Sequence, residues 1–173
     1  GRQEDGIFFR VWAGIKGDIS RKLSMLAQVG YGNAFFLADP SLNLSGIDGL
    51  LGKFEIALRP VLTQRFALGF ARDYKFRHYS TFLLDTNAYF KYKGLFFGRL
   101  GAGVDFTYTF RQLSTGLSRT EHQYSAGVLL ELMITEFLHI DAQYRFAAVN
   151  PSSTDEGEYL DSRVLIGVTL GFK

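Results

Sequence analysis

The chain alternates apolar and polar residues over nine long segments, and this alternation restricts the fold more than any other feature. The segments span residues 7–16, 23–37, 50–59, 65–75, 81–92, 95–110, 121–133, 137–147 and 159–173. In FFGRLGAGVDFTYTF, Phe96 to Phe110, one parity is almost wholly apolar and the other holds small, polar and charged residues. A period of two predicts β-strands with two chemically different faces. The sequence therefore predicts an all-β fold.

The first segment also fits a second pattern. Phe8, Val11, Trp12, Ile15 and Ile19 are spaced like one face of a helix. Gly14 and Gly17 lie within the same stretch, and glycine weakens a helix interior. We therefore favour a strand over residues 7–16.

From Leu50 onward, charged residues are confined to one parity. The apolar parity holds essentially one charge, Arg72. The basic residues on the polar parity, within or just beyond the strands, are Lys53, Arg59, Arg65, Lys75, Lys91, Arg99, Arg111, Arg145 and Arg163. The acidic residues are Glu55, Asp73, Asp85, Asp105, Glu121, Glu131, Asp141 and Asp161. Such separation requires a medium on one side of the sheet that excludes charge.

That medium is either the dry interior of a soluble barrel or bilayer hydrocarbon outside a transmembrane barrel. The polar parity is also rich in glycine and alanine, which suits the narrow interior of a small barrel. The apolar parity carries aromatics toward the strand ends, like the interfacial girdles of membrane barrels. The aromatics predicted to face lipid are Phe54, Phe66, Phe96, Phe106, Tyr108, Phe110, Tyr144, Phe146 and Phe172.

The remaining alternative is a soluble, lipocalin-like ligand-binding barrel. The Gly-x-Trp signature of that family is absent, because the single tryptophan lies in Val11-Trp12-Ala13-Gly14. The segments are also about ten residues or longer, which is enough to cross hydrocarbon at a tilt. Both observations favour the membrane alternative.

The final segment, VLIGVTLGF over Val164–Phe172, is similar to the aromatic-ended closing strand of small bacterial outer-membrane β-barrel proteins. The resemblance covers nearly the whole chain, with the departure that Lys173 follows the aromatic. It implies one domain over residues 1–173, a closed antiparallel up-and-down transmembrane β-barrel, and location in the bacterial outer membrane. Lipid bilayer and lipopolysaccharide are then the surroundings. We expect that a signal peptide was removed before the starting GRQEDG.

Single-chain bacterial barrels have even strand counts, so nine segments pose a problem. Eight strands result if residues 7–16 lie outside the barrel, and ten if Gly32-Asn33 is a tight turn. A further strand from elsewhere would also restore an even number. Chain length favours eight, which is the count we expect.

The inner side of the barrel is predicted to be a narrow, charge-paired lumen. Its lining comprises Lys53, Glu55, Arg59, Arg65, Asp73, Asp85, Arg99, Asp105, Glu131, Asp141, Arg145, Asp161 and Arg163. Because an uncompensated buried charge is costly, these groups are expected to pair. The predicted role is structural anchoring or partner binding, and we expect the long Leu23–Leu37 segment to offer an edge to an envelope protein. The alternative is a narrow pore for small polar solutes.

Several other functions have little support in the sequence. With 19 Lys and Arg against 17 Asp and Glu, no basic excess indicates nucleic acid binding. There is no cysteine, and no residue spacing indicates a metal or cofactor site. His78 and Ser80 in RHYST resemble the His-x-Ser of outer-membrane lipid A deacylases, which would make the chain a lipid-modifying hydrolase. The match is three residues long and has no acid at a familiar spacing, so we expect no enzyme activity.

Overall fold

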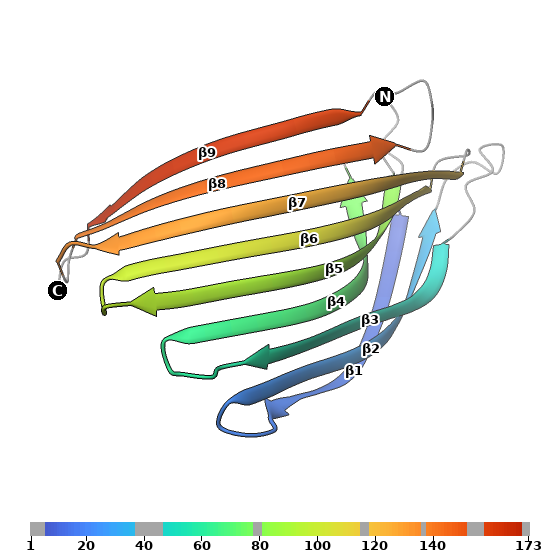
Figure 1. Ribbon diagram of the computed structural model, residues 1–173. Coiled ribbons are helices and arrows are strands. Elements are labelled where there is room, and N and C mark those ends of the chain that lie inside the picture. The colour runs from blue at the N-terminus through green and yellow to red at the C-terminus, as the bar shows by residue number, and fades with distance from the viewer. Residues whose placement is uncertain are drawn as a thin grey trace.

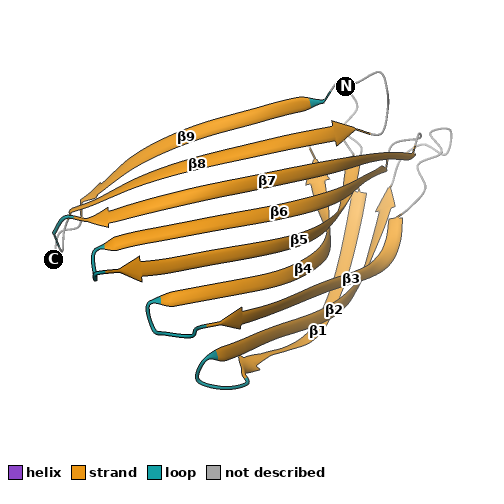
Figure 2. Cartoon of the chain, viewed as in Figure 1, coloured by secondary structure: helices purple, strands orange, loops and turns teal. Residues whose placement is uncertain are grey.

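The computed structural model describes residues 6–36, 47–77, 81–114, 118–135, 138–151 and 158–170, and these residues form a single antiparallel sheet (Figure 1). Figure 2 shows that the described residues are strand or loop, without a helix. The nine strands are β1 (Gly6–Asp18), β2 (Leu23–Phe36), β3 (Ile47–Leu58), β4 (Gln64–Arg77), β5 (Thr81–Phe96), β6 (Leu100–Ser114), β7 (Ser118–Met133), β8 (Leu138–Pro151) and β9 (Tyr159–Leu170).

Each strand pairs with its neighbours in sequence, in the order β1 to β9. The prediction of an all-β, up-and-down antiparallel sheet is therefore confirmed. The register keeps the two parities separate across the sheet. Asp105 lies opposite Lys91 and Gly127, while Val104 lies opposite Tyr92 and Val128. The sheet thus has one continuous apolar face and one continuous polar face.

The expected count of eight strands is wrong, because residues 6–18 form β1. This strand pairs with β2 along its whole length, from Gly6 opposite Phe36 to Asp18 opposite Ser24. The ten-strand alternative is also wrong, since Gly32 and Asn33 lie inside the continuous strand β2. Asn33 pairs with Phe9 on one side and Asp48 on the other, so no free edge for a partner lies there.

The turn between β5 and β6 lies at Phe97–Arg99, whereas the sequence pattern places it at Lys93–Gly94. Phe97 and Gly98 have positive φ angles of 51° and 67°, and the Arg99 N–H donates to the Phe96 carbonyl at 3.1 Å. Phe96 lies opposite Leu100, so the hairpin loop has three residues, Phe97 to Arg99. The positive φ angles of its first two residues are those of a turn whose twist matches the strands. The β4–β5 and β6–β7 hairpins likewise extend further than expected, to Arg77 opposite Thr81 and Ser114 opposite Ser118.

The sheet curves so that its polar face is concave. Three polar-face contacts reach across an intervening strand or two. They join Tyr89 on β5 to Glu55 on β3, Lys93 on β5 to Glu131 on β7, and Arg10 on β1 to Asp73 on β4. Neighbouring strands in a flat sheet lie about 4.8 Å apart, so such contacts are favoured where the strands curl toward that face.

Burial in this sheet is the reverse of burial in a soluble protein. Asp85 is fully buried and Glu121 is 8% exposed, whereas Ile166 is 75% exposed and Leu68 is 64% exposed. Within the described ranges, the buried hydrophobic cluster consists of Leu51, Tyr74 and Leu84 alone. None of the described segments is a helix able to span a membrane. The exposed fractions of Leu68 and Ile166 show that the apolar face of the sheet is uncovered.

The sheet is open, because β1 and β9 form its two edges and do not pair (Figure 1). In an antiparallel meander of nine strands, the first and last strands run in the same direction. A direct ladder between β1 and β9 would therefore be parallel, whereas one further strand between them would allow antiparallel pairing on both sides.

Candidate functional site

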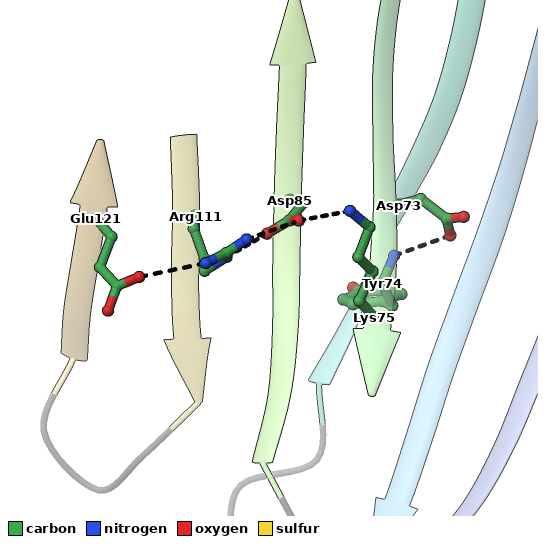
Figure 3. Close-up of polar contacts among 6 residues, drawn as sticks. All are labelled: Asp73, Tyr74, Lys75, Asp85, Arg111 and Glu121. Atoms are coloured by element: carbon green, nitrogen blue, oxygen red, sulfur yellow. Dashed lines mark hydrogen bonds and ion pairs between the residues drawn. The ribbon is translucent and has the colours of Figure 1, made fainter. Parts of the chain in front are cut away.

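A chain of ion pairs crosses the concave face near the β4–β5 and β6–β7 connections (Figure 3). The Arg111 guanidinium donates from Nε to Asp85 Oδ1 at 2.9 Å and from Nη1 to Glu121 Oε2 at 3.4 Å. Lys75 Nζ lies 3.0 Å from Asp85 Oδ2. The Asp85 side chain is only 1% exposed, so its carboxylate is neutralised by two cations away from solvent.

The strand register explains why these groups meet. Arg111 lies directly opposite Asp85 on β5 and opposite Glu121 on β7. Asp85 also lies opposite Asp73 on β4, a like-charge pair that is unfavourable by itself. Arg10 relieves this repulsion by donating from Nη1 to Asp73 Oδ1 at 2.9 Å. The register therefore brings Asp73, Asp85, Arg111 and Glu121 into one transverse row, and Arg10 reaches its acidic end from β1.

The Tyr74 ring turns toward the concave face, although its parity matches the apolar residues of β4. The β3–β4 ladder ends at Gly52 opposite Arg72, which frees Tyr74 from pairing with β3. The Tyr74 side chain then lies over Gly32 and Gly49. An added β-carbon would be 3.0 Å from ring atom Cε2 at Gly32 and 2.6 Å from the hydroxyl oxygen at Gly49. The alternation of apolar and polar residues could not predict where the Tyr74 ring lies, because its direction depends on where the β3–β4 ladder ends.

A second group of polar side chains lies nearer the β3–β4 turn. The Tyr89 hydroxyl donates to Glu55 Oε2 at 2.5 Å, and Arg65 Nη2 donates to Glu55 Oε1 at 3.1 Å. Tyr89 reaches Glu55 across β4 because Gly69 lies between them without a side chain. Glycine on the polar face therefore provides the space for a contact between β3 and β5.

Gly69→Ala is expected to destabilise the protein by about 1–3 kcal/mol. A β-carbon at this position would lie 2.2 Å from Tyr89 Cζ, and the ring could not retreat without losing Glu55. Urea unfolding of the two variants measures the loss. Gly17→Ala is the control, because no heavy atom lies within 4 Å of its added carbon. Equal stability of the two variants would contradict the prediction, and adding Tyr89→Ala should remove the clash.

Two hollows open on the concave face, toward the end of the sheet that carries the β3–β4 and β5–β6 turns. One, of about 400 Å³, is lined by Arg59, Arg65, Lys93 and Glu131 among others, and we call it the turn pocket. The other, of about 390 Å³, lies between β5 and β8 and includes Lys91, Lys93, Asp105, Gln143 and Arg145; we call it the inner pocket. Lys93 contributes to both and lies 2.9 Å from Glu131 Oε1.

The structure places the predicted lumen residues as follows. The register puts Lys53, Glu55, Arg65, Asp73, Asp85, Asp105, Glu131, Asp141, Arg145, Asp161 and Arg163 on the polar face. Arg59 follows β3, and Arg99 lies in the β5–β6 turn. The sequence pattern does not identify Lys93 or Tyr89 as lumen residues, because it places Lys93 in a turn and because Tyr89 carries no charge.

The aromatics predicted to face lipid lie on the apolar face where they are described. Phe54, Phe106 and Tyr144 are more than two fifths exposed. Phe66 contacts Tyr92 with ring centroids 4.7 Å apart, and the Tyr108 ring lies 5.1 Å from that of Tyr124. Phe96, Phe110 and Phe146 share the same face by register. Phe172 lies outside the described residues.

Ion pairs are the main interactions between side chains on the described part of the polar face. His78 and Ser80, the candidate hydrolase residues, lie outside the described residues. In the described part of the chain, no three His, Asp or Glu side chains are grouped to hold a metal ion. His122 lies on the apolar face, where its Nδ1 is 2.8 Å from the Tyr108 hydroxyl.

Comparison with known proteins adds no family to this description. No protein-family model matches the chain, and no curated protein sequence matches it.

Proposed function

We propose that the chain forms an integral β-barrel of the bacterial outer membrane, with a structural, anchoring or partner-binding role. The single observation that carries this proposal is the inverted burial. Leu68, Val164 and Ile166 are more than 60% exposed, while Asp85 and Glu121 are buried on the opposite face. Water is a poor medium for so large a continuous apolar surface, whereas hydrocarbon suits it.

The length of the apolar stretch supports a membrane span. On β6 the apolar parity runs from Leu100 to Phe110, ten residues apart. At about 3.4 Å per residue this stretch is about 34 Å long. Tilted by about 40°, it would cover roughly 25 Å, which is the height of the apolar band of outer-membrane barrels. Lipid chains and lipopolysaccharide would then cover this face.

The curvature of the sheet favours this proposal over the soluble, lipocalin-like barrel. A soluble barrel would keep its apolar face inside and its charges outside. Here the polar face is concave, since Tyr89 and Glu55 meet across β4 and Lys93 and Glu131 meet across β6. Closure would place these contacts in the lumen, where pairing lowers the cost of burying a charged group.

Closure requires β1 and β9 to be joined, either by one parallel ladder or through an additional antiparallel strand. Exposed side chains on the apolar face continue to both edges, with Val11 at 52% on β1 and Val164 at 67% on β9. An open edge within hydrocarbon would leave backbone groups without hydrogen bonds, which is too costly to persist.

The experiment that tests the proposal is the behaviour of the purified chain with and without detergent. We expect the protein to require detergent or lipid, and to migrate differently on an SDS gel before and after boiling. The reason is that a closed sheet has no free edge at which SDS can begin to unfold it. A folded monomer that stays in solution after detergent is removed would overturn the proposal.

The narrow pore remains a prediction, and the open hollows of about 390 and 400 Å³ on the concave face are the observation that favours it. Both are lined by cations as well as acids, so water and small polar solutes could occupy them.

A further inference from the structure

We propose that the inner pocket binds a small oxyanion, a carboxylate- or phosphate-bearing solute, through Lys91 and Arg145. This inference rests on the proposed function, because closure of the sheet would turn the concave face into a lumen. The pocket, of about 390 Å³, is within the size range of small-molecule sites.

The pairing of charges distinguishes these two cations from their neighbours. Most other cations on the concave strands contact a carboxylate, as Lys93 does with Glu131 and Arg65 with Glu55. Lys91 and Arg145 contact none among the described residues. Lys91 Nζ instead lies over the Tyr89 ring, 4.8 Å from its centroid. Two cations with no bound acid line one pocket.

The register adds a second observation. One transverse row of the polar face runs Lys91, Asp105, Gly127, Arg145 and Arg163 across β5 to β9. Arg145 therefore lies directly opposite Arg163, a like-charge pair that is unfavourable without an anion. Arg163 is paired with Asp161, its Nη2 lying 2.7 Å from Oδ2. Arg145 has no equivalent partner in the described chain.

Asp105 only partly offsets this positive charge. Its carboxylate lies over Gly127, where an added β-carbon would be 2.5 Å from Oδ1. One acid in this row thus faces three cations, of which Arg163 is already paired with Asp161. The local excess is one positive charge, and the low dielectric of the surrounding bilayer would strengthen its attraction for an anion.

The geometry of the donors favours an oxyanion over a simple halide. An arginine guanidinium presents parallel N–H groups that match the two oxygens of a carboxylate or phosphate. Ser125, Thr107 and Gln143 also line the pocket and can supply neutral hydrogen bonds. The pocket opens on the polar face, away from the face proposed to contact lipid. The occupant is therefore a free solute rather than a lipid headgroup.

Isothermal titration of the full chain in neutral detergent tests this inference, using inorganic phosphate and succinate at constant ionic strength. We expect Lys91→Gln and Arg145→Gln each to weaken binding by about tenfold, the loss typical of one charge-assisted hydrogen bond. Arg145→Lys keeps the charge but loses the parallel N–H groups of the guanidinium, so it should weaken binding less. Lys53→Gln is the control, since Lys53 lies on the same face and lines neither pocket.

Heat-modifiable gel mobility, measured for every variant, separates the two levels of the argument. A wild-type chain that lacks this mobility contradicts the proposed barrel as well as the site. A folded wild-type chain that binds neither phosphate nor succinate overturns the oxyanion site alone. The same conclusion follows if Lys53→Gln weakens binding as much as Lys91→Gln, because the attraction would then be nonspecific.

Discussion

Val128→Arg is expected to destabilise the folded protein in a bilayer by about 2–4 kcal/mol, the cost of arginine near the midplane of a membrane barrel. Val128 lies on the apolar face of β7, opposite Val104 and Tyr144, and its side chain is 45% exposed. Folding into lipid vesicles at increasing urea measures the change. At about 1.4 kcal/mol per tenfold change, the folding equilibrium should fall by roughly 30-fold or more.

The same substitution gives the opposite result if the apolar face contacts water. A surface arginine at a half-exposed position of a soluble protein costs less than about 0.5 kcal/mol. A neutral effect of Val128→Arg would therefore contradict membrane insertion. Val128→Leu controls for side-chain size and should be tolerated.

Leu129→Arg controls for the direction of the side chain. Leu129 is the next residue on β7 and points to the opposite face, where it lines the inner pocket with Asp105. An arginine there would lie in a polar surrounding, with Asp105 nearby as well as the cations Lys91 and Arg145. We therefore expect a loss smaller than that for Val128→Arg in hydrocarbon. If both variants lose the same stability, the two faces have the same environment and the proposed orientation is wrong.

The sequence was sufficient to predict the strands and their faces, because alternation depends only on neighbouring residues. It failed at the β5–β6 turn. Gly94 suggested a turn, but it lies within β5 and its missing side chain makes room for the Tyr92 ring. The true turn contains Phe97 at a positive φ, a conformation that a phenylalanine rarely adopts.

The contacts on the concave face could be predicted only in part. Parity placed Arg111, Asp85 and Glu121 on one face, and the register then made them neighbours. The contact between Tyr89 and Glu55 joins strands that are not adjacent, so it depends on the curvature of the sheet and on Gly69. The strand count also failed, since the rule of even numbers applies to closed barrels and the described sheet is open.

Arg111→Met is expected to cost about 3–5 kcal/mol, the loss seen when one partner of a buried ion pair is removed. Asp85 is fully buried, and Arg111 contacts it through both Nε and Nη2 at 2.9 and 3.5 Å. Without Arg111, Lys75 would be the remaining cation in contact with the carboxylate among the described residues. Urea unfolding of the micelle-folded protein measures the difference in unfolding free energy.

Lys75→Met is the matched control, because Lys75 contacts the same carboxylate but its own side chain is more exposed to solvent. Its side chain is 58% exposed against 22% for Arg111, so solvent already screens its charge. An exposed ion pair contributes about 1 kcal/mol or less, and we expect a loss of that size. Equal losses for the two variants would indicate that water reaches Asp85 and that its burial does not govern the pair.

A double variant separates the lost ion pair from the lost packing of the arginine side chain. Asp85→Asn in the Arg111→Met background removes the uncompensated carboxylate while leaving the volume of the side chain nearly unchanged. If the buried charge causes the loss, the double variant should be more stable than Arg111→Met alone, because a neutral amide is far less costly to bury. A double variant that is less stable than the single one would assign the loss to packing between β5 and β7.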